Sequence, residues 1–172
     1  GVFGTGGLNN VSGTILGGTI ISGDGRALTA SSNPTLDGVT LGSAGSPDLT
    51  VNGGLFVSNG ITLADGATVT KDSGIWYWNK TGTQTLAVAG GGTATLVSGG
   101  GYHYAGYGIA GQTLQFAAGL TQQGTISIFD SSAANVVNLG TIAQSTRWVA
   151  AQKPGVDTWR TLAGQVSSYL DS

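Results

Sequence analysis

The chain of 172 residues has no cysteine, no methionine and no glutamate, and it has only 3 prolines and 1 histidine. Without cysteine, neither a disulfide framework nor a thiolate metal site can form. A lone His103 does not supply the cluster of side chains that a protein metal site needs. We therefore expect no metal and no cofactor.

Charge is scarce as well. Charged residues make up 8% of the chain, the eight acids are all aspartate, and the net charge is -2. Such a chain has no basic footprint for a nucleic-acid backbone, so nucleic acid is not an expected partner. Residues 81–129 carry no charge, but glycines and polar residues break them up, so no run is long and apolar enough for a membrane helix.

Glycine, by contrast, is abundant, with 32 residues, and threonine and serine are frequent. These residues favour strands and tight turns, while the helix-favouring residues glutamate and methionine are absent and lysine is rare. Hydrophobic residues make up 40% of the chain, which is too many for intrinsic disorder, and no collagen-type glycine period occurs. The composition predicts a folded, all-β protein.

Residues 48–70 show the most regular pattern. Apolar residues alternate in short stretches, and the turn pairs Asn52-Gly53, Asn59-Gly60 and Asp65-Gly66 separate them. Such units are typical of half-buried strands joined at residues that tolerate positive φ. They fit either the hairpins of a meander or the flat sides of a β-solenoid, a prism whose corners are turned by glycine.

A prism of this kind can be closed by one chain or shared by three chains that each supply one side at every level. Each strand holds few apolar residues and no helix is expected to cover them, so we expect the shared version, a homotrimeric fibre. On this interpretation residues 1–73 form a repetitive β-helix or β-prism shaft.

From residue 74 onward aromatic residues concentrate and the expected strands become longer. This pattern predicts a β-rich head over residues 74–157, either a β-sandwich or a β-prism. The spacing of Trp159, Leu162, Val166 and Tyr169 predicts a short helix in a C-terminal segment, residues 158–172.

Aspartates offer little for catalysis. Asp24, Asp37 and Asp65 each precede a glycine, as turn residues do, and there is no glutamate. Hydrolysis of a glycoside needs two carboxyl groups on opposite sides of the bond, and no such pair can be assigned from spacing. We therefore do not expect an enzyme.

Two aromatic groups are better candidates for binding. Trp76, Tyr77 and Trp78 place two indoles on one side of a strand and a phenol on the other. Aromatic rings stack on the C–H faces of sugars, so an exposed group of this kind suits a glycan. Trp76 and Trp78 instead fit core packing, which would leave Tyr77 exposed.

The second group lies in residues 99–108, where glycines flank Tyr102, His103, Tyr104 and Tyr107. It is either a binding loop on a rigid scaffold or a pair of strands whose tyrosines pack between subunits. His103 is expected as a hydrogen-bonding ring and not as a metal ligand. Trp148 and Trp159 are expected in a core.

Several stretches resemble a known class of protein. TGGLNNVSGTILGG, RALTASSNPTLDGVTLGS and LTVNGGLFVSNGITL resemble the repetitive distal shaft of bacteriophage tail fibres and tailspikes. GTISIFDSSAANVVNLGTIAQSTRWVAAQ and DTWRTLAG resemble strands in the heads of such fibres. SSYLDS, which ends at Ser172, is similar to the junction before an endosialidase-type intramolecular chaperone.

The resemblance implies a homotrimer at the tip of a tail fibre, extracellular and part of the virion, that binds a host surface polysaccharide or glycan. Ser172 would be the maturation serine, left by a single self-cleavage of the chaperone, and the chain would be a processed product. The alternative is a bacterial surface adhesin, a one-chain β-solenoid with about 20 or more residues per turn. A glycan depolymerase is less expected.

Overall fold

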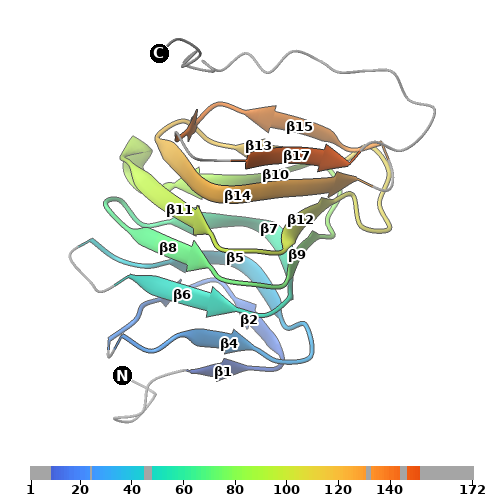
Figure 1. Ribbon diagram of the computed structural model, residues 1–172. Coiled ribbons are helices and arrows are strands. Elements are labelled where there is room, and N and C mark those ends of the chain that lie inside the picture. The colour runs from blue at the N-terminus through green and yellow to red at the C-terminus, as the bar shows by residue number, and fades with distance from the viewer. Residues whose placement is uncertain (1–8, 24, 45–47, 131–132, 144–146, 152–172) are drawn as a thin grey trace, which may run out of the picture.

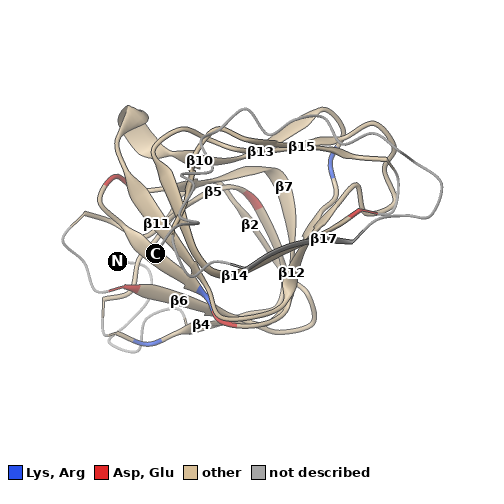
Figure 2. Ribbon diagram, turned by 45° about the horizontal axis from the view of Figure 1, so that its top comes forward, with Lys and Arg blue, Asp and Glu red and all other residues tan. Residues whose placement is uncertain are grey.

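The computed structural model describes residues 9–23, 25–44, 48–130, 133–143 and 147–151. This part of the chain is all-β, as the composition predicts, and it winds into a β-solenoid of about six turns (Figure 1). Apart from strands, the described residues contain one short 3₁₀ turn, η1 (Ala89–Gly91). The strands stack in parallel ladders that form three faces of a prism, seen obliquely in Figure 2.

Each turn of the chain contributes one strand, or half of a long strand, to each face. Face 1 contains β1 (Asn10–Val11), β4 (Leu28–Ala30), β6 (Leu49–Asn52), β8 (Thr68–Lys71), β11 (Ala94–Ser98), the first half of β14 (Leu120–Asp130) and β16 (Thr141–Ile142). Face 2 contains β2 (Thr14–Leu16), the first halves of β5 (Thr35–Leu41) and β7 (Leu55–Leu63), β9 (Ile75–Trp78), β12 (Tyr102–Ala105), the second half of β14 and β17 (Arg147–Ala151). Face 3 contains β3 (Thr19–Ile20), the second halves of β5 and β7, β10 (Thr83–Val88), β13 (Thr113–Phe116) and β15 (Asn135–Asn138).

The ladders decide between the architectures that the repeats allow. Every strand pairing in the described residues is parallel, and the paired residues are 19 apart at Asn10 and Thr29 and 30 apart at Thr83 and Thr113. The hairpin meander is therefore wrong. One chain closes each turn of the prism, so the arrangement in which three chains share every level is also wrong for these residues. Association of three complete prisms stays a prediction.

The corner residues explain why glycine is so common. Gly53, Gly60 and Gly66, each the second residue of a predicted turn pair, all have positive φ and turn the chain from one face to the next. At Gly60 a Cβ atom would lie 2.6 Å from the carbonyl oxygen of Thr85 in the turn above. The turn pairs thus form corners of a solenoid and not the ends of hairpins.

The aspartates of the turn pairs bind neighbouring turns. Asp65 accepts a hydrogen bond from the backbone N–H of Thr93 (2.9 Å), and Asp37 accepts one from the side-chain amide of Asn59 (2.5 Å). Both pairs join residues more than 20 positions apart. These carboxylates therefore hold one corner to the next, a contact between turns that sequence alone does not show.

The core lies inside the prism, where alternate side chains of each strand point. Columns of aligned apolar residues run along the axis, and Leu36, Val57 and Trp78 form one of them. The expectation of a thin single-chain core missed this stacking, because it counted apolar residues strand by strand. In the solenoid each buried side chain is also covered by the turns above and below.

The same ladders run through the expected boundary at residue 73, because β9 pairs with β7 on one side and with β12 on the other. The division into a shaft (1–73), a head (74–157) and a C-terminal segment (158–172) stays a prediction about function. The predicted C-terminal helix and Trp159 lie outside the described residues. No helix within the described residues is long and apolar enough to span a membrane.

Candidate functional site

Strand β9 separates the first aromatic group into an inner and an outer set. Trp76 and Trp78 are 0% exposed and lie in the core, while Tyr77 between them points outward and is partly exposed. The alternation of a strand explains this division, since successive side chains point to opposite faces. The core-packing interpretation of the two tryptophans agrees with the structure.

Strand β12 divides the second group in the same way. Tyr102 and Tyr104 point outward, and His103 is buried inside the prism. Tyr107 lies beyond the strand in the loop before β13 and is 42% exposed. The glycine-flanked segment is therefore part strand and part loop, and its three tyrosines share the outer side with Tyr77.

The register of face 2 aligns four outward rings in one column. Phe56 pairs with Tyr77, Tyr77 pairs with Tyr104, and Tyr104 pairs with Phe129. The ring centroids of successive members are 5.1, 5.8 and 5.1 Å apart. The column therefore runs parallel to the solenoid axis over four consecutive turns.

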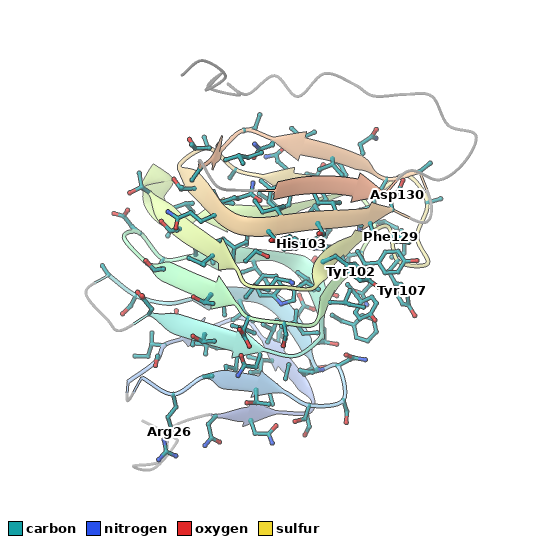
Figure 3. All side chains as sticks on the ribbon, in the orientation of Figure 1. Arg26, Tyr102, His103, Tyr107, Phe129 and Asp130 are labelled. Atoms are coloured by element: carbon teal, nitrogen blue, oxygen red, sulfur yellow. The ribbon has the colours of Figure 1, made fainter. Side chains whose placement is uncertain are left out.

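Two more rings widen this column. Tyr107 contacts Tyr77 (4.7 Å between centroids), Tyr104 (5.1 Å) and Phe56 (5.9 Å). Tyr102 contacts Phe129 at 5.7 Å and Tyr104 at 6.1 Å. Figure 3 shows Tyr102, Tyr107 and Phe129 on the outer side of the coil, with His103 on the inner side. We call the six residues the aromatic strip: Phe56, Tyr77, Tyr102, Tyr104, Tyr107 and Phe129.

Buried Gln112 holds the loop that carries Tyr107. Its side-chain amide nitrogen donates to the carbonyl oxygens of Trp78 (2.9 Å) and Lys80 (2.6 Å), and its oxygen accepts from the N–H of Gly106 (2.7 Å). The glutamine is 0% exposed and thereby ties the Tyr107 loop to the turn below. The hydrogen bonds of Gln112 therefore fix the Tyr107 loop, and with it the ring of Tyr107, relative to the strands of the prism.

The polar groups of the strip face outward. None of the four phenol hydroxyls makes a hydrogen bond to another residue in the part of the chain that the structure describes. Burial, and then the neighbouring Tyr102, Tyr107 and Tyr104, raise the pKa of Tyr77 above its ordinary value. The phenol therefore stays neutral at physiological pH and serves as both donor and acceptor.

His103 belongs to the interior. Its Nδ1 accepts a hydrogen bond from the indole N–H of Trp78 (3.3 Å), and its ring packs against Trp76 and Phe116 with centroids 5.5 Å away in each case. Burial, and secondarily the charge of Lys71, lowers its pKa to about 3. His103 is thus a neutral core residue, which removes it from the predicted binding set.

Lys71 is the second titratable group inside the prism. Its ammonium donates to the carbonyl oxygens of Gly74 (3.0 Å) and Gly100, and burial lowers its pKa to about 8. Both acceptors are neutral backbone groups at the corner between faces 1 and 2. Their position indicates that this lysine braces the corner rather than meeting a ligand.

Three contributors to this site escaped prediction from the sequence: Phe56, Phe129 and Gln112. Phe56 and Phe129 are single aromatic residues in otherwise ordinary strands. The signal that could have found them is the length of each turn, because it places Phe56 one turn before Tyr77. Gln112 offers no such signal, since its importance comes from carbonyl groups more than 30 residues away.

Two further predicted positions have side chains outside the described part of the chain. Trp148 lies in β17 next to Ile126 of β14, but its side chain falls outside the description, and Ser172 lies outside the described residues altogether. The described residues contain no group of three histidine, cysteine or acidic side chains that could hold a metal ion. Asp130 follows Phe129 and accepts a hydrogen bond from the N–H of Ala134 (2.9 Å).

No protein family, curated protein or solved structure matches the chain. The functional argument therefore depends on the geometry of the strip and on the chemistry of its side chains.

Proposed function

We propose that this chain is a glycan-binding attachment module, the distal part of a phage tail fibre that acts outside the cell as a homotrimer of the virion. The observation that carries the glycan part of this proposal is the aromatic strip. Six rings gather on one face of the prism, and four of them bring hydroxyl groups that make no hydrogen bond to another residue within the described part of the chain. The repeats that resemble fibre shafts support the tail-fibre part.

Carbohydrates are the ligands that best fit such a surface. Sugar rings present C–H faces that stack on aromatic planes, and their hydroxyls exchange hydrogen bonds with phenols. A binding site on a strand scaffold also loses little conformational entropy on binding, because ladders on both sides fix its backbone. Tyr77 and Tyr104 are at the centre of this proposed site.

A bacterial surface adhesin is the second candidate, and one observation favours it. The separation of 19 to 30 residues between aligned strands is that of a one-chain solenoid, as the adhesin alternative requires. Both candidates use the aromatic strip in the same way. They differ in the number of chains that assemble, which mass measurements distinguish.

Glycan binding is tested on a printed panel of neutral and anionic polysaccharides, with the purified chain as the probe. We expect binding to at least one polysaccharide and a loss of about tenfold in affinity for Tyr104→Ala, because one central stacking contact disappears. The matched control is Thr95→Ala, an outward position on face 1 that should bind like the unaltered chain.

Absence of binding to every polysaccharide in the panel would contradict the proposed function. If Thr95→Ala loses as much affinity as Tyr104→Ala, the aromatic strip is not the glycan-binding site. The same incubations report on cleavage, since a depolymerase would release new reducing ends. We expect no new reducing ends, because none of the six residues of the strip carries a carboxyl group.

A further inference from the structure

The aromatic strip is long and narrow, and its long axis is that of the solenoid. Phe56, Tyr77, Tyr104 and Phe129 occupy one column over four turns, and successive turns are about 4.8 Å apart. A compact ligand would cover only one or two of these rings. A ligand that uses the whole column must be extended in the same direction.

The strip is also uncharged. None of its six members carries a charge, and four of the residues beside the column are neutral: Ser58 of β7, Ile75 of β9, Asn79 just after β9 and Ser127 of β14. The charges that lie next to the column are carboxylates, Asp130 directly after Phe129 and Asp37 paired with Ser58, and neither favours an anionic ligand. Ser58 and Asn79 already bond to each other (3.0 Å between the hydroxyl and the amide oxygen). The described cation nearest in sequence to the strip, Lys80, begins the next corner. Nothing in the column would offset the charge of an acidic sugar.

We propose that the aromatic strip binds a linear, neutral polysaccharide that lies parallel to the solenoid axis, with about one sugar ring on each turn. The inference depends on the proposed glycan-binding function and specifies its ligand. In an extended chain of pyranose rings the repeat is similar to the rise between turns. Successive sugars can therefore repeat the same contact, each stacking on one ring while the phenols of Tyr77 and Tyr104 bond to its hydroxyls.

The geometry predicts how affinity depends on ligand length. Oligosaccharides of two to six units are prepared by partial hydrolysis of the polysaccharide that binds best on the panel, and each is titrated by calorimetry. We expect affinity to rise about three- to tenfold per added unit, as each further ring is stacked, and to level off at about four units.

Phe129→Ala provides the sharpest variant, because Phe129 forms one end of the column and is 41% exposed, so its removal opens no cavity in the core. It should bring the plateau down by about one unit and weaken the binding of four-unit and longer oligomers by about three- to tenfold, which is more than it weakens the disaccharide, because the disaccharide can still stack on two of the remaining rings. The control Gln115→Ala changes an outward residue of face 3 and should leave the whole length series as it was. Circular dichroism and melting temperature verify that both variants fold.

Each alternative outcome contradicts a different statement. If the disaccharide binds as tightly as longer oligomers, the axial arrangement is wrong and the proposed glycan function survives. If acidic polysaccharides bind best, the neutral ligand is wrong. If no glycan binds and Phe129→Ala instead dissociates an oligomer, the strip is an interface with a second copy of this chain, and both proposals fail.

Discussion

His103 shows how the setting of a single residue changes its role. In the sequence it stands between two tyrosines in a glycine-rich segment, which made it a binding candidate. In the prism it faces inward, and the indole N–H of Trp78 occupies its Nδ1. Since that indole is only a donor, the ring carries its proton on Nε2 and is neutral.

The lowered pKa of His103 predicts that the protein loses stability in mild acid. Between pH 6.5 and about 3 the unfolded chain binds a proton at this ring and the folded chain does not. The free energy of unfolding therefore falls as the pH drops through this range, by about 1 kcal/mol per pH unit. Urea unfolding at several values between about pH 6.5 and 5 measures the slope.

His103→Gln is the matched variant, because it retains an acceptor for the indole N–H and does not titrate. Its unfolding free energy should depend much less on pH over the same range, because the substituted side chain binds no proton in either the folded or the unfolded state. An unchanged slope in this variant would show that another group is responsible.

At the scale of elements, the corners matter as much as the strands. Alternation along the strands was visible in the sequence and correctly divided Trp76 and Trp78 from Tyr77. The turn pairs were also visible, but their role was not, because a glycine of positive φ serves a hairpin and a solenoid corner equally well. Only the long-range pairing of strands distinguishes these two uses.

Gly60→Ala should therefore lower the free energy of unfolding more than Gly82→Ala, a change at another glycine of positive φ. Both Gly60 (φ 78°) and Gly82 (φ 75°) would place alanine in the left-handed region, which costs about 1–2 kcal/mol. At Gly60 the new Cβ would also collide with the carbonyl oxygen of Thr85, while nothing lies within 4 Å at Gly82. Comparison of the two urea midpoints checks this; equal losses would show that the collision relaxes freely.

The loop that carries Tyr107 is a second element whose position is set from a distance. We expect Gln112→Ala to lower the melting temperature, because it leaves buried hydrogen-bonding groups unpaired at about 1–3 kcal/mol each. It should also weaken glycan binding about three- to tenfold, because Tyr107 is no longer held against Tyr77 and Tyr104.

Gln84→Ala is the control for this prediction. Gln84 is a buried glutamine too, but its oxygen accepts from the N–H of Gly60 (3.1 Å) and its amide nitrogen donates to the carbonyl oxygens of Thr81 and Thr83 (3.4 Å each), so its hydrogen bonds go to residues other than those of the Tyr107 loop. It should lower the melting temperature without changing glycan affinity. If both variants lose affinity equally, Gln112 supports the fold in general and does not position Tyr107.

At the scale of the whole molecule, one chain closes each turn of the prism. Burial of the core and association of three chains are therefore separate questions, although we inferred the second from the first on the basis of the sequence. A thin core per strand was the reason to expect three interwound chains, but stacked turns bury these side chains without partners. A trimer would now have to form between finished prisms. Leu16, Ile21 and Leu139 are large apolar side chains outside the strip that remain exposed in the described part and are available for such contacts.

Light scattering on purified protein tests the expected homotrimer. A trimer gives a mass of three times 17.0 kDa that persists on dilution, because stable interfaces of this kind bury well over about 1,200 Å². A single species near 17.0 kDa would contradict the trimer and favour the one-chain adhesin. Glycan binding through the strip is compatible with either mass.

Side-chain alternation and positive φ are local properties, so the sequence by itself determined the all-β class, the half-buried strands and the placement of Trp76 and Trp78 on the side of their strand opposite Tyr77. The number of residues in each turn is not a local property, because it depends on which distant strands pair with one another. Only the tertiary structure could therefore close the prism within one chain. The same pairing of strands aligned Phe56 and Phe129, which are far apart in the sequence, in a single column with Tyr77 and Tyr104.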